Sequence, residues 1–312
     1  MKHYVFLRNA ILLCALFCTQ GLVAQVFRSV SMDTIPVPGM EFSRPVGFMP
    51  DGRSLLLTTA TQAGLWLYGM ENQSLRQLTD ALGAGSEPSV SADGSSVIHR
   101  TVSFNATHQR LTALDVLDMT NGEADRLLQP QRQVPAYRFA ENTAMAVCPA
   151  GEQVYKVRGM AQADASRMPV VSLNEDLQLA VTEGGASRVL SPNGTEATYL
   201  WPSLSPDGSR VLYYVSGVGA YVCNIAGDGV TFVSHDCRAP QWFDDETIVG
   251  MYDTDDTKVL TSSCIMAYTL DGKSQQLTSP SSFTMYPRCH AASGRIACCT
   301  ADGRLVVVHA ER

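Results

Sequence analysis

Residues 201–234 decide the fold, and they read WPSLSPDGSRVLYYVSGVGAYVCNIAGDGVTFVS. Short runs of apolar, aromatic and β-branched residues alternate here with glycine-containing turns, which is the pattern of consecutive antiparallel strands. The Asp207-Gly208 pair marks a tight hairpin turn, because glycine adopts the positive φ that such turns need. The pattern predicts one four-stranded sheet, with strands over residues 202–206, 211–215, 220–225 and 230–234.

The same order of turns and strands recurs along the chain. Each copy opens with a proline, at positions 45, 88, 135, 202, 240 and 287. Most intervals between these prolines match the roughly 40–50 residues of one four-stranded propeller blade. The longer interval after Pro135 is interpreted as one degenerate copy with an insertion around residues 158–168. Six copies account for nearly all of residues 25–312, which we assign to a single propeller domain.

The fold class that these repeats predict is all-β, a six-bladed β-propeller of four-stranded blades. Residues 211–215 are apolar without polar alternation, so both faces of such a sheet need to be covered. Packing the sheets face to face around an axis buries both faces and leaves only short, protected edges. The last copy offers three strands before Arg312, and residues 26–31 are strand-like. We therefore expect the N-terminal strand to complete the last blade.

The first 24 residues are predicted to be a signal peptide and not part of the fold. Lys2 and Arg8 give a positive start, and residues 10–18 form an apolar stretch that is too short to span a bilayer. Ala24 supplies a small residue before Gln25, which is a plausible cleavage point.

A lipid anchor is the alternative interpretation of this region, with Cys14 or Cys18 as the modified residue. Leu13 and Phe17 precede these cysteines where a small residue is normally required, so this alternative is disfavoured. Cleavage near Ala24 leaves residues 25–312 as a periplasmic or secreted protein, and no later segment indicates a membrane span.

Composition excludes two further classes. Hydrophobic residues make up 45% of the chain and charged residues 17%, so a large core can be buried and global disorder is excluded. The formal net charge is −7, and no basic run is present. A nucleic-acid binder needs a basic face to neutralise phosphates, so we expect no nucleic-acid partner.

Most of the cysteines are interpreted as small hydrophobic residues of buried strands, and disulfides are permitted. Of nine cysteines, seven remain after cleavage, and an exported protein meets an oxidising compartment. A two-residue turn at Ser293-Gly294 would place Cys289 opposite Cys298, which makes them a disulfide candidate, although a slip of one residue would select Cys299 instead. No C-x-x-C pair occurs, so the sequence predicts neither a metal site nor a cofactor.

Two segments carry a family resemblance. Residues 205–216, SPDGSRVLYYVS, resemble the signature of TolB-type propeller repeats, and residues 65–79, LWLYGMENQSLRQLT, resemble the latter half of such a repeat. The resemblance implies a WD40-like propeller. In that family TolB is periplasmic, and its propeller binds a peptidoglycan-associated lipoprotein. TolB also has an α/β domain before the propeller, which this chain lacks, so the chain resembles a stand-alone relative.

Aromatic and charged residues beside the opening prolines form the candidate binding surface. In a propeller these positions lie near the entrance of the central tunnel, and Trp, Tyr and Arg are common anchors of interfaces. Packing between blades is the alternative role, above all for the two tryptophans. The set is Arg44, Glu87, Tyr137, Arg138, Trp201, Trp242, Tyr286, Arg288 and His290.

The function predicted is therefore non-enzymatic binding by a monomer, with an envelope or extracellular protein, peptide or glycan as partner. The alternative is a lyase-like, metal-assisted enzyme acting on acidic oligosaccharides, with His290 and Arg288 in the central channel. His235-Asp236-Cys237 is not a nucleophile set, because adjacent residues of an extended segment point to opposite faces. We assign no catalytic residue.

Overall fold

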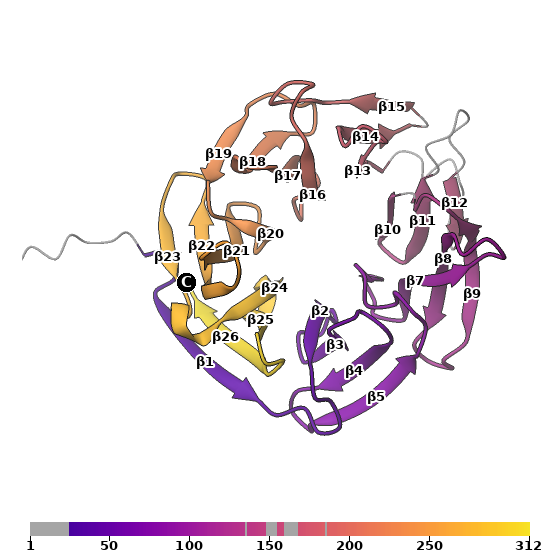
Figure 1. The fold of residues 1–312 in the computed structure, drawn as a ribbon, viewed down its shortest axis with the longest axis horizontal. Helices are drawn as coiled ribbons and strands as arrows, with labels where there is room; N and C mark the ends of the chain where they lie inside the picture. The colour runs from indigo at the N-terminus through magenta and orange to yellow at the C-terminus, as the bar shows by residue number, and fades with distance from the viewer. Residues whose placement is uncertain (1–24, 135, 148–154, 159–167, 185) are drawn as a thin grey trace, which may run out of the picture.

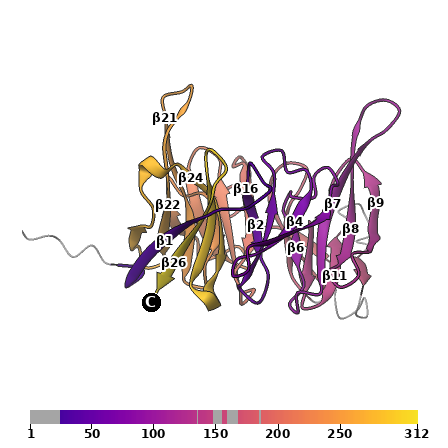
Figure 2. The same cartoon turned by 90° about the horizontal axis from the view of Figure 1, so that it is seen from below.

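The computed structural model describes residues 25–312 except 135, 148–154, 159–167 and 185. In this part of the chain, antiparallel strands form sheets that stand side by side in a ring around a central axis (Figure 1). Seen from the side, the ring is a flat disc whose strands run across its thickness (Figure 2). Two short 3-10 helices, Pro280–Ser282 and Ala291–Ser293, are the helices among the described residues.

The first three sheets in chain order have these bounds. One contains β2 (Arg44–Phe48), β3 (Ser54–Thr58), β4 (Leu65–Gly69) and β5 (Ser74–Thr79). The next contains β6 (Ser89–Val90), β7 (Ser96–Phe104), β8 (Arg110–Asp118) and β9 (Ala124–Gln131). A three-stranded sheet follows, with β10 (Ala136–Ala140), β11 (Thr143–Val147) and β12 (Tyr155–Arg158).

The remaining sheets complete the ring. A second three-stranded sheet contains β13 (Val170–Leu173), β14 (Leu179–Glu183) and β15 (Ala186–Val189). Next come β16 (Tyr199–Leu204), β17 (Arg210–Val215), β18 (Gly219–Asn224) and β19 (Thr231–Ser234). They are followed by β20 (Arg238–Trp242), β21 (Thr247–Asp255), β22 (Leu260–Thr269) and β23 (Ser274–Gln276). The last sheet contains β24 (Thr284–His290), β25 (Arg295–Thr300), β26 (Leu305–Glu311) and β1 (Ser29–Ile35).

The prediction of an all-β propeller is confirmed, but the number of sheets differs from the expected six. The described residues form seven sheets, of which five are four-stranded and two are three-stranded. The interval after Pro135, expected to be one degenerate blade, contains both three-stranded sheets. The sequence pattern missed β15, a short strand whose four residues ASRV are all exposed. Without it the interval has too few strands for two sheets.

Closure of the ring by the N-terminal segment is confirmed. Strand β1 pairs antiparallel with β26, from Ser29 opposite Glu311 to Ile35 opposite Leu305. It begins later than the expected residues 26–31. The backbone N–H groups of Val26 and Phe27 instead donate hydrogen bonds to the Gln275 side chain, 2.9 and 2.7 Å long, in the sheet of β20–β23. The segment thus contacts two neighbouring sheets at the junction of the chain ends.

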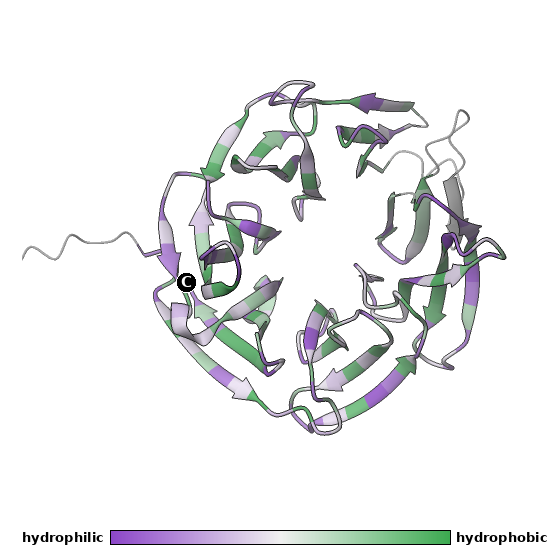
Figure 3. Cartoon of the chain, viewed as in Figure 1, coloured by the Kyte–Doolittle hydropathy of each residue, from purple (hydrophilic) through white to green (hydrophobic). Residues whose placement is uncertain are grey.

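The core lies between the sheets, as expected from strands that are apolar on both faces. In β17, Leu212 and Tyr213 are fully buried although they are adjacent in sequence. Tyr213 packs with Val181 of the preceding sheet, and Leu212 packs with Ile248 of the following one. The central strands are accordingly the most hydrophobic parts of the ring (Figure 3).

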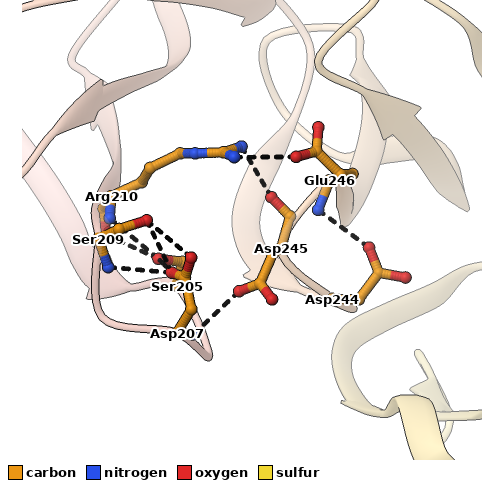
Figure 4. Close-up of polar contacts among 7 residues, drawn as sticks. All are labelled: Ser205, Asp207, Ser209, Arg210, Asp244, Asp245 and Glu246. Carbon is orange, nitrogen blue, oxygen red and sulfur yellow. Dashed lines mark hydrogen bonds and ion pairs between the residues drawn. The ribbon is translucent and has the colours of Figure 1, made fainter.

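Polar contacts link neighbouring sheets at the hairpin turns (Figure 4). The Asp207 carboxylate accepts hydrogen bonds from the Ser205 hydroxyl at 2.6 Å and from the Ser209 backbone N–H at 2.9 Å. The backbone N–H of Asp207 donates to the Asp245 carboxylate of the next sheet at 2.9 Å. Arg210 binds the carbonyl oxygen of Asp245 at 2.9 Å and the Glu246 carboxylate at 2.8 Å. The Ser-Pro-Asp-Gly motif therefore stabilises its own turn and its junction with the next blade.

This turn gives a prediction about pH. Hydrogen bonds from the side chain of Ser205 and then from Ser209 lower the pKa of Asp207 from 3.8 to about 2. Because the native pKa lies below the unfolded value, the ionised carboxylate stabilises the fold above about pH 4, and this contribution is lost as the pH falls towards 2. We expect Ser205→Ala to shift the Asp207 titration midpoint upward, as measured by carboxyl NMR. Ser281→Ala, in the distant turn after β23, is the matched control, and an unchanged midpoint in Ser205→Ala would refute the assignment.

Two expectations about membranes concern different parts of the chain. Residues 1–24 lie outside the described residues, so the signal peptide stays a prediction. In the part of the chain that is described, neither helix has the length and apolar character needed to cross a membrane.

Candidate functional site

A cavity of about 420 Å³ lies at the centre of the ring, among β2, β16, β20, β24 and the segment before β6. Five of the nine predicted binding residues line it: Arg44, Glu87, Trp201, Tyr286 and Arg288. They meet there because the innermost strands of different sheets converge on the axis (Figure 1). Polar residues that the sequence did not indicate complete the wall: Gln62, Ser86, Ser203 and Gln241.

The backbone around the cavity adopts an unusual conformation. Five lining residues that are not glycine have positive φ: Gln62 (59°), Glu87 (53°), Trp201 (50°), Ala239 (45°) and Tyr286 (57°). Four of them directly precede a proline, and register shifts interrupt β16, β20 and β24 at these points. Such residues cost about 1–3 kcal/mol each and gather at ligand-binding and active sites. Of the twelve described residues that have positive φ and are not glycine, five therefore line this one cavity.

Two arginines dominate the charge of the cavity. The Arg44 guanidinium lies 3.7 Å from the centre of the Tyr286 ring. Arg288 donates hydrogen bonds to the carbonyl oxygens of Val46 at 3.1 Å and Pro287 at 3.0 Å, which fixes its position across the gap between β24 and β2. Burial, and then the nearby charge of Arg44, lower the pKa of Arg288. The two cations repel each other in this site.

Buried polar atoms without a partner point to the same cavity. Three such side-chain atoms occur among the described residues: Arg44 Nε, Ser203 Oγ and His99 Nε2. Arg44 and Ser203 both line the cavity. Because buried polar groups in native proteins are almost always hydrogen-bonded, each exception needs an explanation, and a role in ligand binding is one.

Tyr137 lies behind the wall and holds Glu87 in place. Its hydroxyl donates to the Glu87 carbonyl oxygen at 2.8 Å and accepts a hydrogen bond from Arg100 Nε at 3.0 Å. Arg100 also binds the Glu87 carboxylate, with 2.7 Å between Nη2 and Oε2. Burial raises the pKa of Tyr137 to about 12, so the phenol is neutral. The Glu87 carboxylate therefore has its own cation and does not neutralise Arg44 and Arg288 fully.

Three predicted residues contact neighbouring blades and do not line the cavity. Arg138 binds the carbonyl oxygen of Pro169 at 3.1 Å, and the Trp242 indole donates to the carbonyl oxygen of Ser203 at 3.4 Å. His290 lies at the end of β24, where its Nε2 is 3.2 Å from the carbonyl oxygen of Pro50. The expected placement of His290 in the channel is corrected, because β24 carries Tyr286 and Arg288 to the cavity and His290 beyond it.

The cysteines also require a correction. The hairpin between β24 and β25 closes through Ala291–Ser293 and Gly294, a longer turn than the expected two residues. Cys289 consequently lies opposite Ile296, and the directly opposed pair with Cys298 is not formed. Cys289, Cys298 and Cys299 are free thiols here. Burial raises the pKa of Cys289 to about 12, which keeps this thiol protonated. Cys148 lies outside the described residues.

No cluster of His, Cys, Asp or Glu side chains suited to a metal ion occurs in the described ranges of the chain.

Comparisons with known proteins identify the fold. No family model matches the chain. No curated protein sequence matches it either. Among solved structures, the β-propeller domain of Myceliophteria thermophila Cps50 (Swd1) is similar, with a TM-score of 0.59, 11% identity, and coverage of 90% of this chain and 99% of that one.

Two further solved structures are similar. A putative TolB from Agrobacterium tumefaciens has a TM-score of 0.52, 14% identity, and coverage of 91% of this chain and 98% of its own. For the Pyrococcus horikoshii acylaminoacyl peptidase the TM-score is 0.54 and the identity 13%, and the match covers 80% of this chain but only 48% of the peptidase. At these identities the similarity concerns the fold alone, and it confirms the resemblance to TolB-type and WD40-like propellers at that level.

Proposed function

We propose that this protein is an exported, non-enzymatic TolB-like propeller that binds a protein, peptide or envelope glycan at its central cavity. The observation that carries the proposal is the convergence of five predicted residues on one cavity that also holds strained backbone and unpartnered polar atoms. Concave sites of this size with a few converging polar groups are typical of ligand binding. We further propose that the protein acts in the periplasm or outside the cell, after cleavage near Ala24.

Capture from an envelope extract tests this function, with mature protein as bait and Trp201→Ala as the variant. Trp201 lines the cavity and is 38% exposed, so its ring is available to a partner. Loss of an aromatic anchor of this kind costs about 2 kcal/mol or more, so we expect capture of the specific partner to fall about thirtyfold.

The matched control is Phe104→Ala, because Phe104 is 60% exposed at the end of β7 and does not line the cavity. Equal capture by wild type and both variants would contradict binding at the cavity. N-terminal sequencing of the exported product tests the localisation separately, with a chain starting near Gln25 as the expected result.

The alternative function is an enzyme that acts on acidic oligosaccharides, which the two cavity arginines favour. His290 lies 3.2 Å from the carbonyl oxygen of Pro50 and outside the residues that line the cavity, so this alternative relies on Arg44 and Arg288. Activity screening on such oligosaccharides, with and without added divalent metal ions, distinguishes the two functions.

A further inference from the structure

The cavity carries more positive than negative charge. Arg44 and Arg288 line it, and Arg100 lies directly behind Glu87. Glu87 is the only acidic residue among the described residues of the wall. This local excess stands out in a chain whose formal net charge is −7.

Arg44 and Arg288 have N–H donors that form no hydrogen bond within the fold. Arg288 donates Nε and Nη1 to backbone carbonyls, and Arg44 stacks on Tyr286 while its Nε has no hydrogen-bond partner. A guanidinium offers five N–H donors, so both side chains retain donors for a further acceptor. Ser203 contributes a buried hydroxyl that also lacks a partner. Donors that surround a cavity and lack acceptors fit an anion, and carboxylates bind arginine through paired hydrogen bonds.

Unpaired backbone and aromatic side chains in the cavity wall favour a peptide as the molecule that carries this anion. The register shifts in β16 and β24 leave Trp201, Pro202, Tyr286 and Pro287 out of the regular pairing of their strands. The backbone N–H of Tyr286 donates to Met251 Sδ, and the carbonyl oxygen of Pro287 accepts a hydrogen bond from Arg288. The Trp201–Pro202 step in β16 is therefore the part of this unpaired backbone that can pair with the main chain of a bound segment. Trp, Tyr and Arg are also the residue types that dominate protein recognition.

We propose that the cavity recognises a carboxylate on a peptide segment of the partner, with Arg44, Arg288 and Ser203 as the groups that bind it. This inference rests on the proposed binding function and specifies its ligand. The carboxylate is either the free C-terminus of the peptide or an Asp or Glu side chain.

Labelled peptide pools with mature protein test this directly. One pool has random tetrapeptides of neutral residues with a free C-terminal carboxylate, a second has the same tetrapeptides amidated, and a third is amidated but contains one Glu. We expect binding of the first or third pool, with affinity about tenfold to a hundredfold above that for the second, and weakening as salt is raised. The first pool against the third distinguishes a C-terminal from a side-chain carboxylate.

Variants of the arginines and of Ser203 distinguish a role in peptide binding from a role in the stability of the fold. Arg44→Met and Arg288→Met should each abolish the preference for the acidic pools. The matched control is Arg53→Met, which should retain it, because Arg53 is exposed and forms an ion pair with Glu71 at 3.7 Å. Arg44→Met also removes a half-buried charge that repels Arg288, so we expect an unchanged or higher melting temperature. A purely structural Arg44 would instead give a lower one. Ser203→Ala should fold normally and bind the acidic pools more weakly.

The outcomes distinguish this inference from the function on which it rests. Equal binding of neutral and acidic pools, dependent on Trp201, would overturn the carboxylate inference and leave a binding propeller. Binding of oligogalacturonate but of no peptide pool would overturn the peptide as carrier. If no peptide pool binds but Trp201→Ala still loses capture of the partner, the carboxylate inference is overturned and the binding function stands. If no pool binds and no partner is captured either, the proposed function is overturned as well.

Discussion

A chain that lacks residues 25–35 is expected to aggregate, or to melt more than about 10 °C below the full mature protein. The deletion removes β1, and β26 then presents an unpaired edge along Leu305–Glu311. It also removes Phe27, which is fully buried and lies 5.0 Å from the Phe243 ring of the neighbouring sheet. An unpaired apolar edge is a template for association between chains.

The size of the effect follows from the burial and the hydrogen bonds that this segment provides. Removal of a buried Phe side chain costs about 3–5 kcal/mol, and removal of each backbone hydrogen bond costs about 0.5–1.5 kcal/mol. Folded domains have about 5–15 kcal/mol of stability, so the deletion removes much or all of it. In a domain of this size each kcal/mol corresponds to about 2–4 °C in melting temperature.

Two point variants in the same segment should lower the free energy of unfolding by different amounts. Phe27→Ala should lower the free energy of unfolding by about 3–5 kcal/mol in urea titration. Met32→Ala, in β1 at a side chain that is 48% exposed, should change it by less than about 0.5 kcal/mol. A deletion variant that stayed soluble and melted with the full mature protein would show that the ring does not depend on this closure.

Much of the fold could be predicted because its repeats carry local signals. The Asp-Gly turns and apolar strands located the hairpins, and the unpaired last copy indicated closure by the N-terminus. The exposed strand β15 and the interval after Pro135 carry no such signal, since that interval lacks an Asp-Gly turn. The two three-stranded sheets therefore could not be separated by pattern.

The candidate site could be predicted in part, for a topological reason. Opening prolines mark the innermost strands, so residues beside them, such as Trp201 and Tyr286, were identified. Ser203 and Gln241 line the cavity because register shifts rotate the strands after those prolines, and such shifts leave no clear trace in a single sequence. His290 was misplaced because its strand runs past the cavity to the turn.

Gly85→Ala is expected to destabilise the protein by about 3 kcal/mol and to disturb the cavity at the same time. Gly85 lies beside Glu87 in the wall, and its N–H donates to the Gln62 carbonyl oxygen at 3.1 Å. A Cβ atom there would lie 2.0 Å from Thr58 Oγ1 and 2.3 Å from Thr58 Cβ. Thr58 is fully buried, so a side-chain rotation cannot relieve the contact and the backbone has to move.

For Gly85→Ala, urea unfolding measures the loss of stability, and binding of the acidic peptide pools measures the disturbance of the cavity. Gly47→Ala is the matched control, because a Cβ atom at Gly47 meets nothing within 4 Å; its free energy of unfolding should change by less than about 1 kcal/mol. Thr58→Gly in the Gly85→Ala background removes the clashing Cβ and should recover part of the stability, a positive coupling between the two sites. If Gly85→Ala were as stable as wild type, the close approach of these segments would not exist. Glu87 would then owe its position at the cavity to Tyr137 and Arg100 alone, because the contact between the segments of Gly85 and Thr58 would no longer hold it there.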